Sequence, residues 1–168
     1  MSINKACFES IDIIENIKKQ GGLRTKGIFK SNKDNEPLIS IITVVLNNDK
    51  YLEEAIESLK VQKYKNFEHI IIDGGSTDKT LEIIKKNEKN IDYWISKKDD
   101  GLYDAFNTGM LLVRGDYLGF LNSDDKYTEN ALSILLKYIR LFPKKDFIFG
   151  AVKKHWGTLY GYKPYKIF

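Results

Sequence analysis

The stretch ISIITVVLNN, residues 39–48, predicts the fold of this chain. It opens with eight residues that are almost all apolar and mostly β-branched, a pattern typical of a strand buried on both faces of a parallel sheet. Apolar residues then recur at helical spacing over residues 52–59, and a second apolar run follows at residues 69–72. A strand, a helix and a second strand in this order predict a βαβ unit.

The same alternation continues along the rest of the chain. Glycine, serine and aspartate over residues 74–78 supply a turn, and Gly115 and Pro143 stop later helices. Helices are predicted near residues 81–84, 102–113 and 131–139, and strands at residues 93–95, 117–121 and 147–149. Because crossovers between parallel strands are right-handed, this order predicts an α/β fold: an open, mostly parallel, Rossmann-like sheet with helices on both faces.

The length of 168 residues suits one main domain with short appendages. An apolar share of 42% and a charged share of 30% exclude collagen-like and wholly disordered classes. Residues 5–19 are predicted to form an amphipathic helix, and the polar stretch after it is predicted to be a linker. The expected units are the N-terminal helix and linker (1–37), the main domain (38–152) and a basic aromatic tail (153–168).

Neither a membrane span nor a signal peptide is predicted, so the chain is expected to be cytoplasmic. The single Cys7 has no cysteine partner within the chain and is expected to pack as a small apolar residue. The tail mixes lysines with aromatic residues and carries no acid after Asp146. This composition is typical of a solvated edge, or of a peripheral contact with an anionic surface such as the inner face of a membrane.

Polar residues follow the predicted strands at the edge where open α/β sheets bind ligands, beyond the carboxyl ends of the strands. An edge so rich in acids argues against a nucleic acid as a partner. The residues at this edge are Asn47, Asn48, Asp73, Asp99, Asp100, Asn122, Asp124 and Asp125.

The adjacent acids Asp124 and Asp125 repel each other unless a positive charge lies nearby. Hard carboxylate oxygens suit Mg²⁺ or Mn²⁺, and such a cation would bridge the two carboxylates and the phosphates of a nucleotide. It would act there as a Lewis acid when a leaving diphosphate gains charge. Alternatively, the two residues would only turn the chain and cap the next helix.

Asp73 ends the second predicted strand, where its carboxylate would accept hydrogen bonds from a base or a ribose. The two glycines that follow would let that ligand approach the backbone, although they are also ordinary turn residues. Asp99, Tyr103 and Asn107 are spaced by four and are expected on one face of a helix. That face would place Asp99 near a sugar hydroxyl, or would simply be solvated.

Four segments occur in a set order: ISIITVVLNN, HIIIDGGSTDKT, SKKDDGLYDAFNTGMLLVRGDY and GFLNSDD. Together they resemble the nucleotide-binding domain of glycosyltransferase family 2, which has the GT-A fold, from Leu38 to about Val152. The resemblance implies transfer of a sugar from a nucleotide diphosphate donor, such as a UDP-sugar, to an acceptor hydroxyl, usually with inversion. The acceptor would be a glycan or a lipid-linked sugar in bacterial-type polysaccharide or glycoconjugate synthesis.

The resemblance also implies roles for individual residues. Asp73 would bind the nucleotide base, and Asp99 with Asn107 would face the donor sugar. Asp124 and Asp125 would form the acidic motif that holds Mn²⁺ or Mg²⁺, with Asp125 as the direct ligand and Asp124 also beside the nucleotide. Further nucleotide contacts are implied for Thr43, Val45, Asn47, Ser76 and Asp78.

Two features depart from the family pattern. Thr108 follows Asn107 where members often carry a basic residue, which removes one expected diphosphate contact. Inverting transfer also needs a general base, which in the family is a carboxylate beyond the metal motif. Here no Asp or Glu follows Asp146, and only His155 is an ordinary titratable base in the tail. The catalytic base is therefore unassigned, and the hypothesis is a truncated transferase that retains the donor half. The alternative is a noncatalytic nucleotide-sugar-binding or assembly module.

Two other nucleotide-binding classes are disfavoured. A dehydrogenase-like domain needs a GxGxxG turn after the first strand, and residues 47–49 lack those glycines. A P-loop needs a spacing that residues 75–80 do not have. A homo-oligomer is expected if residues 147–168 expose apolar surface that a second copy would cover.

Overall fold

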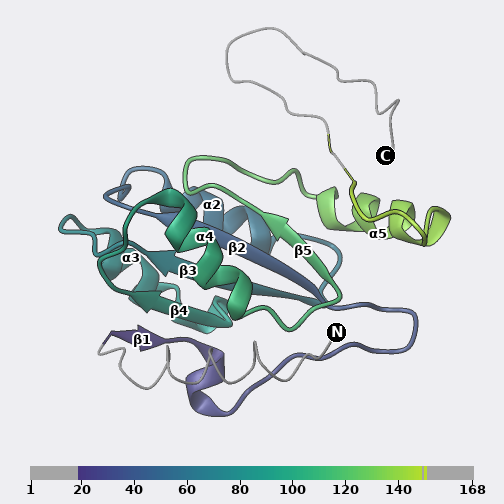
Figure 1. The fold of residues 1–168 in the computed structure, drawn as a ribbon, viewed down its shortest axis with the longest axis horizontal. Helices are drawn as coiled ribbons and strands as arrows, with labels where there is room; N and C mark the ends of the chain where they lie inside the picture. Colours follow the sequence, from purple (N-terminus) through teal and green to yellow (C-terminus); the bar gives the residue numbers. More distant parts are fainter. Residues whose placement is uncertain (1–18, 149, 151–168) are drawn as a thin grey trace, which may run out of the picture.

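The computed structural model describes residues 19–148 and residue 150, and a sheet of five strands forms its centre. The strands are β1 (Gln20–Gly21), β2 (Ile39–Val45), β3 (Phe67–Asp73), β4 (Tyr93–Ser96) and β5 (Tyr117–Phe120). They lie in the order β1-β4-β3-β2-β5 (Figure 1). All neighbours pair in parallel except β1, which runs antiparallel along β4. The predicted open, mostly parallel sheet is confirmed.

Helices cover both faces of this sheet, as the sequence predicts. The α-helices are α2 (Leu52–Lys60), α3 (Thr80–Lys86), α4 (Leu102–Leu111) and α5 (Ala131–Leu141), and the short 3₁₀ helices are η1 (Leu23–Lys26) and η2 (Glu88–Asn90). On one face, Ile42 of β2 packs in a cluster with Ala105 of α4. On the other face, Ile41 packs in a cluster with Ala55 of α2 and Leu132 of α5.

The sequence of β2 explains its place at the centre of the sheet. All seven of its residues are buried, and because successive side chains of a strand point to opposite faces, both faces need residues that tolerate burial. Helix α4 lies directly on the strand at Gly109, where a Cβ would lie 2.7 Å from Cγ2 of Ile42. A side chain at this position would therefore push α4 away from β2.

The segment after residue 19 is part of the domain, although the sequence indicates a linker over residues 21–37. Gln20–Gly21 forms β1 and extends the sheet beyond β4. The guanidinium of Arg24 donates to Glu68 Oε2 at 2.5 Å and to the carbonyl oxygen of Leu112 at 2.7 Å. Lys30 Nζ lies 2.9 Å from Asp92 Oδ2. The polar residues of this segment bind buried carboxylates of the sheet, which composition alone does not indicate.

Three other expectations concern the ends of the chain. The predicted helix at 5–19 and the predicted tail at 153–168 lie almost entirely outside the described residues. The strand expected at 147–149 is not seen: Phe147 and Ile148 lie in no strand, and residue 149 is outside the described residues. Within the described part of the chain, no helix is both long and apolar enough to cross a membrane.

The Arg24–Glu68 pair makes the first testable prediction. Glu68 has a side-chain exposure of 1%, so Arg24→Ala leaves a buried carboxylate without its cation. We expect the free energy of unfolding to fall by about 3–5 kcal/mol, which lowers the midpoint of thermal unfolding by roughly 6–20 °C in a chain of this size. Circular dichroism during heating measures this change.

The control variant is Lys60→Ala, which removes an exposed ion pair with Glu57. Exposed pairs contribute about 0–1 kcal/mol, so this variant should melt close to the wild-type protein. Equal melting temperatures for the two variants would show that the Arg24–Glu68 pair does not hold the segment in place.

Candidate functional site

The carboxyl ends of β2, β3, β4 and β5 meet at one edge of the sheet, called the rim here, at the left of Figure 1. Loops that follow different strands are joined there by hydrogen bonds. Asn48 Nδ2, after β2, donates to Ser123 Oγ, after β5, at 2.8 Å. The backbone N–H of Thr77, after β3, donates to Asn47 Oδ1 at 2.8 Å. Asn47 and Asn48 therefore connect the loop that follows Asp73 to the loop that contains Asp124.

Asp73 is the innermost carboxylate of the rim, with an exposure of 0%. Its Oδ1 accepts the hydroxyl of Ser76 at 2.5 Å, and its Oδ2 accepts the hydroxyl of Ser96 at 2.6 Å. The backbone N–H of Ser76 also points at both oxygens, at 3.2 and 3.3 Å. Ser76 is among the site residues predicted from the sequence, whereas Ser96 is not, because it is 23 positions away from Asp73 and meets it only through the pairing of β3 with β4.

Asn47 and Asp78 shape the turns on either side of this carboxylate. Asn47 has a φ of 50°, in the left-handed region that asparagine tolerates better than most residues. Its backbone N–H donates to Ser76 Oγ at 2.8 Å. Asp78 accepts the backbone N–H groups of Asp49 and Thr80. Desolvation acts to raise the pKa of Asp78, but hydrogen bonds from Thr80 and Asp49 outweigh it and lower that pKa below its usual value.

Thr43 and Val45 lie inside the protein. Thr43 has an exposure of 0%, and its Oγ1 lies 3.0 Å from His69 Nε2. Val45 packs in an apolar cluster with Leu52 of α2 and Ile84 of α3. The predicted nucleotide contacts of both residues stay predictions, and in this structure neither side chain faces the rim surface.

Asp99 and Asn107 do not share the helix that their spacing predicts. Helix α4 begins at Leu102 after Gly101, whose φ of 110° breaks the helical path, so Asp99 lies in the loop before the helix. Its Oδ1 accepts the backbone N–H of Gly101 at 3.0 Å. The expected common face of Asp99 and Asn107 is therefore wrong. Asn107 is exposed on α4, about 8 Å of helix rise beyond its first residue.

Asp124 and Asp125 are both exposed in the loop that follows β5. Asp125 Oδ2 accepts Asn122 Nδ2 at 3.0 Å, and the backbone N–H of Asp125 donates to the carbonyl oxygen of Asn122 at 3.1 Å. The N-cap of α5 is Asn130, so neither acid caps that helix. Turn formation accounts for the backbone of Asp125 but leaves the carboxylate of Asp124 with no role in the turn.

Comparison with known proteins places this arrangement in a family. Residues 40–167, which are most of the chain, match the family described as Glycosyl transferase family 2. This chain belongs to glycosyltransferase family 2. The predicted resemblance is confirmed, and with it the GT-A character of the fold.

Curated relatives of this chain are longer proteins. An uncharacterised glycosyltransferase of Rickettsia conorii is 39% identical over 123 residues, which are 72% of this chain and 20% of the relative. One of Mycobacterium tuberculosis is 39% identical over 93 residues, which are 55% of this chain and 36% of the relative. The chain thus spans about a fifth to a third of the length of these two proteins.

Solved structures share the fold. TarS of Staphylococcus aureus, residues 1–349 in complex with UDP-GlcNAc, superimposes with a TM-score of 0.59 at 25% identity, over 64% of this chain and 32% of that one. The mannosyltransferase PcManGT of Pyrobaculum calidifontis, in complex with GDP-Man and Mn²⁺, gives a TM-score of 0.61 over 90% of this chain and 45% of that one. At 17% identity, the second likeness shows the fold alone.

Asp124 and Asp125 are of the ligand type that a divalent cation needs. Asp124 and Asp125 offer carboxylate oxygens to solvent, and no group of three or more potential metal ligands exists among residues 19–148. Mg²⁺ and similar hard cations are commonly held by only one or two carboxylates together with substrate phosphates. The residues present therefore fit a cation that is bound jointly with a phosphorylated ligand.

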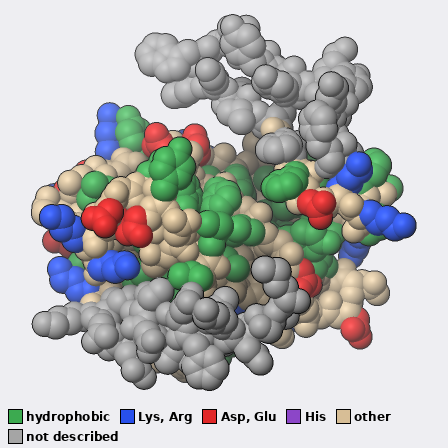
Figure 2. All heavy atoms as spheres, viewed as in Figure 1, with side chains coloured by type: hydrophobic (Ala, Val, Ile, Leu, Met, Phe, Trp, Pro, Cys, Tyr) green, Lys and Arg blue, Asp and Glu red, His purple; other side chains and the backbone are tan. Residues whose placement is uncertain are grey.

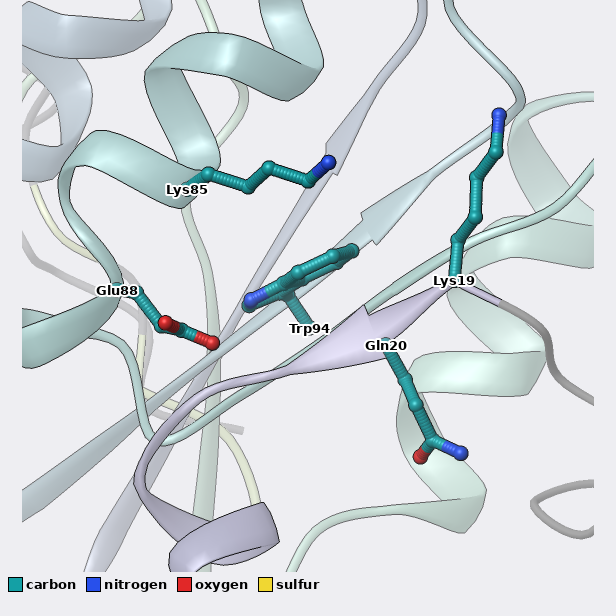
Figure 3. A pocket seen from close by; sticks show the side chains of 5 residues that line it. All are labelled: Lys19, Gln20, Lys85, Glu88 and Trp94. Carbon is teal, nitrogen blue, oxygen red and sulfur yellow. The ribbon is translucent and has the colours of Figure 1, made fainter.

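A cavity of about 390 Å³ lies away from these acids. Figure 3 shows the indole of Trp94, on β4, between Lys85 and Glu88, with Lys19 and Gln20 on the far side. None of the rim carboxylates lines this cavity. Its position beside β1 separates it from the loops that follow β2 and β5, so it is not the site described above.

The buried His69 makes the second testable prediction. Burial, helped by the charge of Lys30, lowers the pKa of His69 to about 3, whereas an unfolded histidine titrates near 6.5. The pKa of His69 is lower in the folded state than in the unfolded state. His69 therefore does not reduce the free energy of unfolding above pH 6.5, but protonation of the unfolded state reduces that free energy as the pH falls from 6.5 toward 3. We expect the wild type to lose about 2 kcal/mol through His69 between pH 7 and pH 5.

Urea unfolding of wild type and His69→Gln at both pH values measures this contribution. Other groups titrate in both proteins, so the informative quantity is the difference between their two pH dependences. We expect the loss between pH 7 and pH 5 to be about 2 kcal/mol smaller in the variant. The same pH dependence in both proteins would show that folding does not lower the pKa of His69.

Proposed function

We propose that this chain is the donor-binding domain of a metal-dependent glycosyltransferase that moves a sugar from a nucleotide diphosphate donor, a UDP-sugar, to an acceptor hydroxyl. The observation that carries the proposal is the shared rim: Asp73 ends β3, and the Asp124–Asp125 pair lies in the loop that follows β5, two places away in the sheet. Neighbouring strands are about 4.8 Å apart, so β3 and β5 are separated by roughly 10 Å. That separation suits a molecule with a base at one end and a diphosphate at the other.

The proposed roles are those that the family resemblance implies. Asp73 binds the base, Asp99 faces the donor sugar, and Asp125 with Asp124 holds the cation together with the donor phosphates. When bound, Mn²⁺ or Mg²⁺ supplies positive charge to the leaving diphosphate. Ser76, Asp78 and Asn47 are expected beside the nucleotide, because their hydrogen bonds build the turns around Asp73.

The interior residues have a more distant role in this proposal. Thr43 and Val45 support the floor of the site through β2 rather than through a contact with the donor. Asn107 reaches the donor sugar only if the sugar extends along α4, since the residue lies beyond the first turn of that helix.

The proposals about the acceptor and its deprotonation rest only on the resemblance to the family. Transfer with inversion requires a base that removes the proton of the acceptor hydroxyl as it attacks the anomeric carbon. The acceptor would be a glycan or a lipid-linked sugar in polysaccharide or glycoconjugate synthesis. The reaction would take place in the cytoplasm, with the protein peripheral to the inner face of the membrane. UDP-GlcNAc bound to TarS, a neighbour of the same fold, supports a UDP-sugar as the donor.

A second function is donor binding without transfer. It is favoured by the assignment of the rim carboxylates, because Asp73, Asp99, Asp124 and Asp125 all serve the donor and none serves the acceptor. A purified chain that binds a nucleotide sugar, but releases no nucleotide with or without candidate acceptors, would establish this second function.

Isothermal titration with UDP and Mn²⁺ tests the proposal. We expect the wild-type chain to bind UDP only when Mn²⁺ is present. Asp125→Asn keeps the size of the side chain but removes its charge, so it should weaken UDP binding by at least about tenfold, or about 1.4 kcal/mol.

Asp116→Asn is the matched control, because Asp116 is exposed just before β5, at the opposite end of the same strand. This variant should bind UDP as the wild type does. The proposal fails if the wild type gives no heat with UDP and Mn²⁺, or if both variants bind as tightly as the wild type.

A further inference from the structure

The cavity beside β1 is formed by residues that have no role in the proposed function. Its volume of about 390 Å³ is within the usual range for sites that bind small molecules. Its walls come from β1 and the residue before it, from α3 and η2, and from β4. Among the described residues, those that line it are Lys19, Gln20, Lys85, Glu88 and Trp94.

Gly21 leaves open the space between two polar groups at one end of this cavity. It lies opposite Trp94 in the pairing of β1 with β4. A Cβ on Gly21 would overlap Oε1 of Glu88 and would lie 2.6 Å from Nε1 of Trp94. Any other residue at this position would therefore displace one of the two polar groups.

The indole N–H of Trp94 is the unusual group at this end. The residue has an exposure of 3%, and within the described part of the chain its Nε1 has no hydrogen-bond partner. Figure 3 shows this nitrogen turned toward the carboxylate of Glu88. That carboxylate is already bound, because Oε1 accepts the backbone N–H of Gly22 at 3.0 Å and Oε2 lies 3.5 Å from Lys26 Nζ. A buried N–H without an acceptor is unfavourable, and a ligand oxygen could satisfy it.

Two lysines provide positive charge at the other end of the cavity. Figure 3 shows the side chain of Lys85 extending across the indole and that of Lys19 beside its far edge, so both ammonium groups lie away from Glu88. Both residues are exposed, and neither forms an ion pair within residues 19–148. Two unpaired ammonium groups on either side of one space attract an anion with several oxygens, such as a phosphate group.

We propose that this cavity is a second binding site, which takes the phosphate monoester of a sugar. Lys19 and Lys85 bind the phosphate, and a sugar hydroxyl lies between Trp94 and Glu88. A hydroxyl fits this place because it can accept a hydrogen bond from the indole N–H and donate one to the carboxylate. The inference goes beyond the proposed function and does not rest on it.

The lining of the cavity favours a soluble sugar phosphate over two simpler ligands. A bare anion would leave the indole N–H unsatisfied or would face the carboxylate of Glu88. A lipid headgroup would bring acyl chains that need an apolar surface beside the site. Figure 2 shows exposed hydrophobic side chains gathered over α4 and β5, and none of the exposed large apolar residues of the described chain lines the cavity.

The fluorescence of Trp94 and isothermal titration test the proposal together. The chain has two tryptophans, so Trp156→Phe leaves Trp94 as the only one. This parent variant is titrated with glucose 6-phosphate, with inorganic phosphate and with glucose, all without a divalent metal. We expect glucose 6-phosphate to change the emission and to bind at least about fivefold more tightly than inorganic phosphate, because only the sugar hydroxyl satisfies the indole N–H. Glucose alone should give neither signal.

Substitutions in the same parent variant locate the site. Lys85→Ala removes a charged donor and should weaken the binding of glucose 6-phosphate at least about tenfold. Lys89→Ala is the matched control, since Lys89 is exposed in η2 but does not line the cavity. It should bind as the parent does, and so should Asp125→Asn, which changes the rim. Circular dichroism confirms that each variant is folded.

Several results would overturn the inference. They are no binding of glucose 6-phosphate, an equal affinity for inorganic phosphate, an equal loss in Lys85→Ala and Lys89→Ala, and a loss in Asp125→Asn. Vesicles that contain phosphatidylinositol 4-phosphate provide a further arm. If they bind through Lys85 while glucose 6-phosphate does not, the site belongs to a lipid headgroup and the inference fails. Because UDP is absent from these titrations, none of these results bears on whether the rim binds UDP with Mn²⁺.

Discussion

The pairing of β2 with both β3 and β5 is the constraint on which the rest of the structure depends. Every residue of β2 is buried, and its parallel register with each neighbour sets all three strands to end at the same edge. Asn47 and Asn48 then join that edge to the loops after β3 and β5 through their side chains. Carboxylates that are about fifty residues apart in sequence can serve one ligand only because this central strand aligns them.

Local patterns in the sequence predict most of this fold and part of its site. The buried strands and amphipathic helices between residues 39 and 141 can be predicted from the spacing of apolar residues, because an element that is buried on one or two faces has apolar residues at regular intervals. The contacts of Arg24 and Ser96 produce no local sequence pattern, since each depends on one partner far away in the chain. The expected common face of Asp99 and Asn107 fails for a local reason: Gly101 delays the start of α4.

Buried polar pairs stabilise both ends of the sheet, with different consequences. At the end away from the rim, Glu68 and Asp92 bind Arg24 and Lys30, so charges of opposite sign fix the first described segment to the sheet. At the rim, Asp73 binds only neutral hydroxyl and N–H groups. Among the described residues, no ion pair joins Asp73 to a cation, whereas Glu68 and Asp92 each pair with one, and in the proposed function the carboxylate of Asp73 accepts hydrogen bonds from the base.

The two acidic positions of the rim are suited to different tasks because of their burial. Asp73 is enclosed, so its orientation is fixed before any ligand arrives, which favours recognition of one shape and one pattern of donors. Asp124 and Asp125 are exposed, and two such carboxylates alone hold a hard cation weakly. A cation would gain its remaining ligands from the phosphates of the donor. Under the proposed function, binding of metal and nucleotide would therefore be coupled: the buried Asp73 would select the base, and the exposed pair would complete its cation site only when the phosphates are present.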